Sequence, residues 1–183
     1  MRYVYKQNSG FSLIEISVIV VIVGIITTLA IAGFTKTIAH QKLNGEIGRA
    51  ISTMRYITDE ARVSKQIVTV FVDFDNELIF AWVDKNENGT YDTGEDKIDD
   101  ITFDTGIDLV AGKLGGTTHS DQMQFLVYGD GSPDLDVRIA IFSPKTEEYR
   151  GLIVKELSGW VEEYEFTYSE LGYLKGITGV PAS

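Results

Sequence analysis

Residues 11–34 read FSLIEISVIVVIVGIITTLAIAGF, an apolar run that carries a single charge, Glu15. At about 1.5 Å per helical residue, this stretch would form a helix of roughly 36 Å, slightly longer than the ~30 Å hydrocarbon core of a bilayer. A secretory signal peptide has its cleavage site after the apolar region, whereas here the small residue, Gly10, lies in front of it. We therefore expect residues 11–34 to form a helix that spans a membrane.

The junction in front of this run resembles the type IV prepilin signature. It reads Ser9-Gly10-Phe11-Ser12-Leu13-Ile14-Glu15. In that family a dedicated peptidase cuts after the glycine on the cytoplasmic side, and the new N-terminal phenylalanine is N-methylated. The resemblance implies that residues 1–10 are a leader, that Gly10 and Phe11 flank the cleavage and methylation site, and that the N-terminus is cytoplasmic. It makes the chain a substrate of the prepilin peptidase and its methyltransferase activity.

Glu15 is a functional candidate because a carboxylate inside an apolar helix costs on the order of 2.5 to 3.5 kcal/mol. The alternative is an interfacial glutamate that reaches the lipid headgroups. In the resembling family this carboxylate meets the N-terminal ammonium of a neighbouring subunit as helices bundle into a filament, and methylation keeps the amine charged. The resemblance therefore implies an assembly role for Glu15 and partnership with other pilins. A buried pair of this kind is better explained as a device for register than as a source of stability.

Composition limits the other functions that the chain could have. Its 183 residues, 44% of them apolar, suffice for one modest domain besides the apolar run, and its net charge of −11 disfavours a nucleic-acid partner. The absence of cysteine excludes a disulfide framework and a thiol catalyst. Of the two histidines, His40 lies in the predicted helix and His119 in a predicted solvated loop. No catalytic motif occurs, so we expect no enzyme.

Residues 35–66 change to the pattern of an amphipathic helix. Apolar residues recur there at steps of three and four: Leu43, Ile47, Ala50, Ile51, Met54, Ile57 and Ala61. We expect this face to dock on the core of a globular domain. A continuous helix from Ser12 to about Lys65 would be roughly 80 Å long, so its first half should protrude into lipid or into a helical assembly.

Residues 67–183 show the period of two that is typical of β-strands. We expect strands at 67–74, 78–83, 97–103, 122–128, 136–142, 151–155 and 161–168, separated by turn signals rich in glycine, proline and aspartate. The predicted fold class is α+β, with a long N-terminal helix packed against an antiparallel β-sheet head.

The head also shows a family resemblance. The stretch from Glu60-Ala61-Arg62 through the first strand, and the later Phe142-Ser143-Pro144 with residues 152–159, is similar to the head of the H-type minor pseudopilins of type II secretion and of the related minor pilins. This similarity implies a low-copy subunit at or near the tip of a filament.

One loop of the head matches the calcium-binding pattern D-x-[DN]-x-[DN]-G-x5-E at every fixed position. The predicted ligands of Ca²⁺ are Asp84, Asn86, Asn88, Thr90, Asp92 and Glu95. Strands are expected on both sides in place of the usual helices, so the metal would have a structural role. The alternative is an ordinary hairpin loop rich in Asn, Gly and Asp.

These observations predict a minor pilin or pseudopilin of a type II secretion pseudopilus or a type IV pilus. It would cross the inner membrane once, with its head in the periplasm or outside the cell, and assemble into a filament. A DNA-uptake pilin is an alternative that the acidic charge disfavours. A second alternative is a solitary membrane protein with a calcium-dependent binding head, which predicts no cleavage after Gly10.

Overall fold

The computed structural model describes residues 11–179, with the side chains of residues 29–33 outside the description. The chain divides into two compact units, the first ending at Ile38 and the second beginning at Ala39. Helix α1, Leu13–Ser64, contributes residues to both units. The predicted helix from Ser12 to about Lys65 is therefore confirmed, whereas the predicted leader, residues 1–10, lies outside the described residues.

The first unit consists, in its described part, of the beginning of α1. All of its described side chains are exposed, including large apolar ones such as Leu13 at 86% and Val20 at 64%. The helix carries apolar side chains on every side here, and a helix of that kind is stable where its whole surface is covered by other molecules. The isolated chain leaves this surface uncovered.

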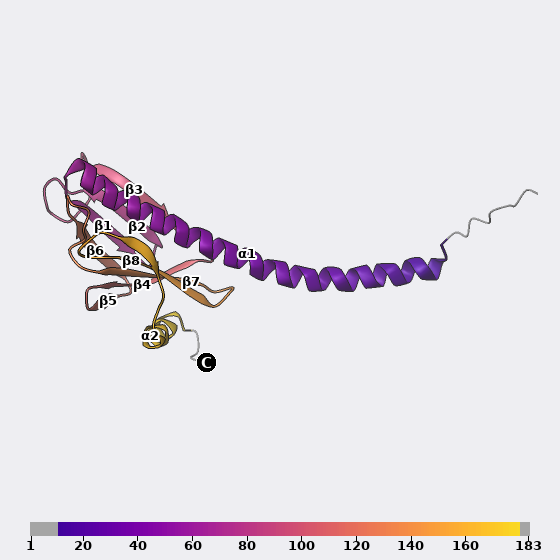
Figure 1. Ribbon diagram of the computed structural model, residues 1–183. Helices are drawn as coiled ribbons and strands as arrows, with labels where there is room; N and C mark the ends of the chain where they lie inside the picture. Colours follow the sequence, from indigo (N-terminus) through magenta and orange to yellow (C-terminus); the bar gives the residue numbers. More distant parts are fainter. Residues whose placement is uncertain (1–10, 180–183) are drawn as a thin grey trace, which may run out of the picture. The chain divides into compact units, whose positions relative to one another are not determined.

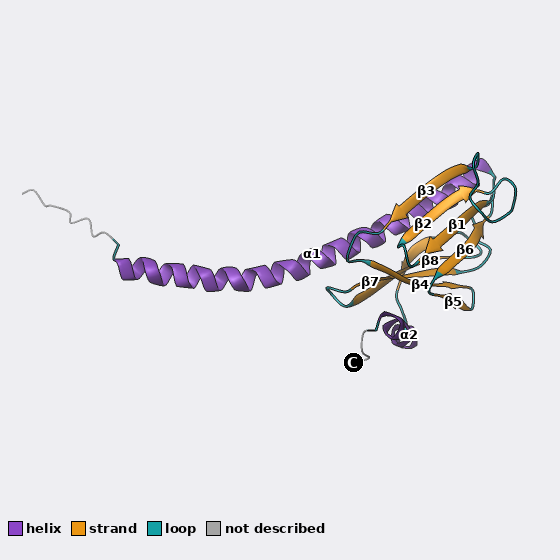
Figure 2. Ribbon diagram, turned by 180° about the vertical axis from the view of Figure 1, so that it is seen from behind, coloured by secondary structure: helices purple, strands orange, loops and turns teal. Residues whose placement is uncertain are grey.

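The second unit contains two antiparallel sheets and a short C-terminal helix (Figures 1 and 2). The four-stranded sheet has the order β3-β2-β1-β6, formed by Asp96–Thr102, Leu78–Val83, Val68–Asp73 and Gln122–Val127. The five-stranded sheet has the order β5-β4-β7-β8-β9, formed by Thr117–His119, Asp108–Leu114, Val137–Ser143, Glu148–Val154 and Val161–Tyr164. The predicted α+β fold is confirmed, and the head has two sheets where the sequence predicted one.

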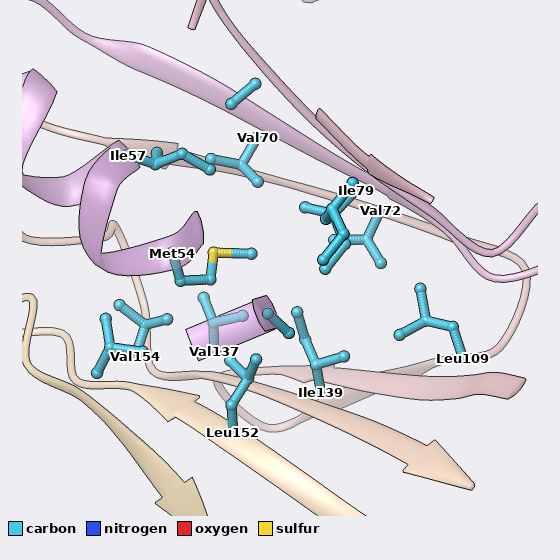
Figure 3. Packing of buried hydrophobic residues seen from close by; sticks show 14 of the residues in the cluster. Met54, Ile57, Val70, Val72, Ile79, Leu109, Val137, Ile139, Leu152 and Val154 are labelled. Carbon is cyan, nitrogen blue, oxygen red and sulfur yellow. The ribbon is translucent and has the colours of Figure 1, made fainter. Parts of the chain in front are cut away.

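The core lies between α1 and the inner faces of both sheets (Figure 3). The buried face of α1 repeats at steps of three and four, with Leu43, Ile47, Ala50, Met54, Ile57 and Ala61 at most 4% exposed. In the four-stranded sheet, alternate residues point inward, and Val72 on β1 lies opposite Ile79 on β2. Ile139 on β7 and Leu152 on β8 cover the helix from the other sheet. Each fully buried Leu or Ile side chain contributes about 1.5–3 kcal/mol, so this face fixes the head on the helix.

Strands β4 and β5 are absent from the sequence prediction, and His119, predicted in a solvated loop, is the last residue of β5. Gly112 interrupts the strand pattern of β4 because glycine is disfavoured in strands. Glycine leaves room there for a neighbouring side chain, since a Cβ would lie 2.7 Å from Cε of Met123 on β6. Strand β5 is three residues long, too short to show an alternating pattern.

The predicted last strand, 161–168, is correct only as far as Tyr164, because helix α2, Tyr168–Thr178, begins soon after it. Thr167 and Glu170 form a capping box, in which each side chain bonds the backbone of the other. Burial raises the pKa of Glu170, but hydrogen bonds from Thr167 and Tyr164 together with the Arg138 charge lower it below its ordinary value on balance. Leu174 packs against an apolar cluster on the five-stranded sheet, so α2 covers part of its outer face.

Arg62 joins the end of α1 to two loops of the head. Its Nε donates to the Asp130 carbonyl at 2.8 Å and its Nη2 to the Ser158 carbonyl at 2.7 Å. Its Nη1 pairs with Asp59 one turn earlier on the helix. A Cβ on Gly131 would clash with the Arg62 side chain, so the loop after β6 can close on the guanidinium only with glycine there. The planar guanidinium bonds both loops at once.

We predict that Arg62→Lys lowers the free energy of unfolding by about 1–2 kcal/mol, because one ammonium cannot hold both carbonyls in this geometry. Urea unfolding of the full chain, followed by near-ultraviolet circular dichroism, measures the change. Arg150→Lys is the matched control, since Arg150 forms an exposed pair with Glu163 and its substitution should change stability by less than about 0.5 kcal/mol. Equal effects of the two substitutions would contradict the role given to Arg62.

Candidate functional site

The N-terminal end of α1 is built around Ser12 and Glu15. The Ser12 backbone N–H donates to Glu15 Oε2 at 3.0 Å, and the Glu15 N–H donates to Ser12 Oγ at 3.2 Å. The Ser12 hydroxyl adds a third bond to the same carboxylate oxygen at 3.1 Å. This reciprocal arrangement is a capping box, and it places a negative charge at the positive end of the helix. The only carboxylate of the apolar run is thus fixed in the first helical turn.

The helix surface after Glu15 is apolar, and hydroxyl groups on it are hydrogen-bonded within the helix itself. The hydroxyls of Ser17 and Thr27 donate back to the carbonyls of Leu13 and Val23 in the same helix. These polar groups therefore need no outside partner when the helix is covered. A continuous exposed apolar surface of this kind marks a site of contact with other molecules.

Among the helices described between residues 11 and 179, none is both long enough and apolar enough to cross a membrane.

Of the two residues that flank the predicted processing site, Phe11 lies within the described residues and Gly10 does not. Phe11 is described and its side chain is 77% exposed, two residues before the start of α1. Gly10 lies outside the described residues. The structure therefore places Phe11 beside the capping box and leaves the Gly10–Phe11 bond itself undescribed.

The predicted metal loop, residues 84–95, connects β2 to β3. Asp84 at its start accepts from the backbone N–H groups of Asn88 at 3.2 Å and Gly89 at 2.6 Å. Glu95 at its end accepts from the N–H groups of Lys85 at 3.0 Å and Asp92 at 2.9 Å. The two terminal carboxylates thus organise the loop from both ends.

The remaining predicted ligands lie within this loop. The side-chain amides of Asn86 and Asn88 donate to Asp92 Oδ2 at 2.9 and 2.7 Å, and these bonds hold the pKa of Asp92 below its ordinary value. Thr90 donates its backbone N–H to the Asn88 side chain. Within residues 11–179, no group of three or more acidic or histidine side chains is placed to hold a metal ion. Calcium binding stays a prediction.

An aromatic contact anchors the loop to the sheet. Tyr91 packs edge-on against Phe80 and Trp82 on the outer face of β2, with ring centroids 4.9 and 6.1 Å apart. On the opposite side of the loop, Gly89 lies close to the Gln124 side chain of β6. The loop therefore crosses the outer face of the four-stranded sheet.

Comparisons with known proteins found a match to the N-terminal motif and a similarity in fold. The family model of the prokaryotic N-terminal methylation motif matches residues 5–31. Two solved structures of the minor pseudopilin EpsH, from the type 2 secretion system of Vibrio cholerae, resemble the chain at 17% identity with TM-scores of 0.50 and 0.52. They cover 67% and 68% of this chain and 96% of the EpsH chain. The fold of the chain is pilin-like.

A third solved structure is less similar. The type IV minor pilin FimU from Pseudomonas aeruginosa has 12% identity and a TM-score of 0.49, over 69% of this chain and 90% of that chain. No curated protein matches the sequence significantly.

In this pilin-like protein, the matched motif includes Gly10, Phe11 and Glu15, the residues that the sequence selected. The capping role of Ser12 was not predicted, although Ser-x-x-Glu before an apolar run is the signal of a capping box. The position of Tyr91 was not predicted either, because only the tertiary structure shows that an aromatic residue inside a polar loop contacts the neighbouring strand.

Proposed function

We propose that this pilin-like protein is a minor structural subunit of a type II secretion pseudopilus or a type IV pilus, located at or near the filament tip. The observation that carries the proposal is an N-terminal methylation motif joined to an exposed apolar helix whose one carboxylate lies in the first turn. The pilin-like head, similar in fold to EpsH, supports the choice of a minor subunit. The role is structural and the chain catalyses no reaction.

Assembly would bury the exposed surface of the first unit against the same segment of other subunits. Leu13, Ile14 and Val20 are at least 64% exposed in the single chain, so helix packing would remove much apolar area from solvent or lipid contact. Glu15 would then need a cationic partner, because an unpaired carboxylate in apolar surroundings costs several kcal/mol. The ammonium of a neighbour's processed N-terminus supplies that charge.

Before assembly, we propose, residues 11–34 anchor the protein in the inner membrane with the N-terminus in the cytoplasm and the head in the periplasm. This part of the proposal rests on the sequence, since the side chains of residues 29–33 are not described. The prepilin peptidase and its methyltransferase activity act on this form at the Gly10–Phe11 bond.

Two alternatives to a secretion or pilus subunit would each require a different property of the chain. A DNA-uptake pilin would need a basic exposed surface, and the net charge of −11 opposes contact with nucleic acid. A solitary membrane protein with a binding head would need no processing after Gly10. Scoring secretion, piliation and transformation in a deletion strain separates the filament systems.

We predict that the mature protein begins at an N-methylated Phe11. Intact mass spectrometry of the chain from native membranes measures this directly. Gly10→Ala should leave the precursor largely uncut, while Gly24→Ala should be processed normally because nothing lies within 4 Å of a Cβ added there. Recovery of residues 1–10 on the assembled protein would contradict the proposal.

For Glu15 we predict that substitution blocks assembly after normal processing. Glu15→Val removes the charge and the capping box, whereas Glu15→Gln removes the charge but can still cap the helix. Both variants should lower the amount of the chain in sheared filaments about tenfold or more, because the neighbour's ammonium loses its buried partner. Wild-type incorporation of Glu15→Gln would show that capping, and not the charge pair, is the role of Glu15.

We also propose that the loop from Asp84 to Glu95 binds calcium as a structural ion. The sequence pattern supports this, with Asp84 and Glu95 at its two ends. The Asn86 and Asn88 amide oxygens, the Thr90 carbonyl and Asp92 would complete the ligands. Strands flank the loop on both sides, so the ion would stiffen a β-connection.

We predict that millimolar calcium raises the melting temperature of the chain relative to chelator, at matched ionic strength, and that magnesium does so less. An affinity of about 10⁻⁴ to 10⁻⁶ M is expected of a site of this kind, and a hundredfold excess over Kd adds about 2.7 kcal/mol. Calorimetry measures the shift. Glu95→Gln should abolish it, and Glu87→Gln, an exposed loop carboxylate at a non-ligand position, should not. Identical melting with calcium and with chelator would exclude the site.

A further inference from the structure

A cavity of about 210 Å³ lies between the first turns of α2 and the outer face of the five-stranded sheet. Its apolar lining comes from Ala111 on β4, Ala140 on β7 and, on the opposite side, Phe166, Tyr173 and Leu174. The cavity opens to solvent at its edge, where Tyr173 is 53% exposed. It is smaller than the roughly 300–1,000 Å³ of pockets that hold drug-sized ligands, so a group about the size of one amino-acid residue fills it.

Two cations line this cavity side by side. Lys113 on β4 lies directly opposite Arg138 on β7 in the strand register. Residues paired in this way point to the same face of an antiparallel sheet, and like charges directly opposite each other are destabilising. The pairing is unexpected in a chain with a net charge of −11. The two side chains therefore mark a place that a bound anion would stabilise.

The protein supplies only part of the negative charge that this pair calls for. Glu170, the one carboxylate of the lining, lies 3.3 Å from Arg138 Nη1. Its oxygens also accept from the Thr167 N–H and hydroxyl and from the Tyr164 hydroxyl. Within residues 11–179, the Lys113 ammonium has no hydrogen bond or ion pair, and Arg138 Nη2 has none either. Because the Arg138 side chain is 29% exposed, a ligand in the cavity can contact it.

We propose that this cavity binds the C-terminal residue of another polypeptide, where that residue has an apolar side chain. The terminal carboxylate lies between Lys113 and Arg138, since an ammonium and a planar guanidinium both form charge-assisted hydrogen bonds with carboxylates. The apolar side chain packs against Ala140 and Leu174. The hydroxyl of Thr118, exposed at the edge of the cavity, accepts from the amide N–H next to the carboxylate.

Other anionic ligands lack one of the features that this lining matches. Phosphate has no apolar part to cover the Ala140 and Leu174 side of the cavity. A long acyl chain exceeds the volume of about 210 Å³. A free amino acid would bring an ammonium group close to Lys113 and Arg138, while the carboxylate of Glu170 is already bonded by Thr167 and Tyr164. A C-terminal residue joins a single negative charge to an apolar group and brings no positive charge.

The main probe is acetyl-Ala-Leu with a free carboxylate. Its binding to the full-length chain in a nonionic detergent, in a buffer without carboxylates or phosphate, is measured by titration calorimetry. Acetyl-Ala-Leu-amide removes the charge, acetyl-Ala-Gly removes the apolar side chain, and 4-methylpentanoate keeps both but lacks the peptide amide. The main probe should saturate below about 10 mM, and each of the other three should bind about tenfold more weakly or not at all.

Lys113→Gln separates binding from folding. It should weaken binding of acetyl-Ala-Leu about tenfold, because one of the two cations is lost. In the free protein it should raise the melting temperature by about 1–3 °C, because the like-charge pair with Arg138 is removed. Lys145→Gln is the matched control, an exposed lysine of the β7–β8 turn outside the cavity, and it should change neither value.

Four results would overturn the proposal. They are unchanged binding in Lys113→Gln, a lower melting temperature of that variant, equal binding of acetyl-Ala-Leu and any of the other three probes, and no saturation up to about 10 mM acetyl-Ala-Leu.

Discussion

The second unit depends on the burial of one stripe of α1 by two sheets. Leu43 and Ala61, at the two ends of this stripe, are 0% exposed, and the core cluster to which they belong includes residues of both sheets. The stripe also contains Glu46, which is 7% exposed and pairs with Arg49 at 2.8 Å. Burial raises the pKa of Glu46 although the Arg49 charge opposes this change. We expect this buried charge to specify the rotation of the helix more than it adds to stability.

The part of α1 in the first unit has a different pattern from the part in the second unit. Its apolar residues form no stripe, so a sheet on one side could not cover them, and lipid or several neighbouring helices are the surroundings that can. Glu15 is compatible with this because the capping box with Ser12 satisfies its carboxylate within its own chain. Its hydrogen bonds therefore lie within the first turn of the same helix.

The sequence predicted the elements whose signals are local and regular. The apolar steps of three and four gave α1, and alternation gave strands such as β1 and β2, because burial of one face determines both patterns. It missed β4 because Gly112 interrupts the strand pattern, and only the fold shows that glycine there leaves room for Met123, a contact between distant parts of the chain. It missed α2 because aromatic residues before Thr167 continued the strand pattern, although Thr-x-x-Glu marked a helix start. The processing motif is a local sequence signal and was predictable, whereas the contact of Tyr91 with Phe80 and Trp82 depends on the tertiary structure and was not.

Loop 84–95 shows how far a local pattern can determine a site. The pattern fixes which side chains are available, and the fold determines where they point: Asp84 and Glu95 toward backbone N–H groups, and Tyr91 against β2. These hydrogen bonds do not prevent metal binding, because each carboxylate oxygen has a second lone pair. Since the acidic side chains are not gathered around one point in this structure, a cation would first have to draw them together. The work of that rearrangement lowers the affinity, which is why the weak, extracytoplasmic range of calcium sites is the one to expect here.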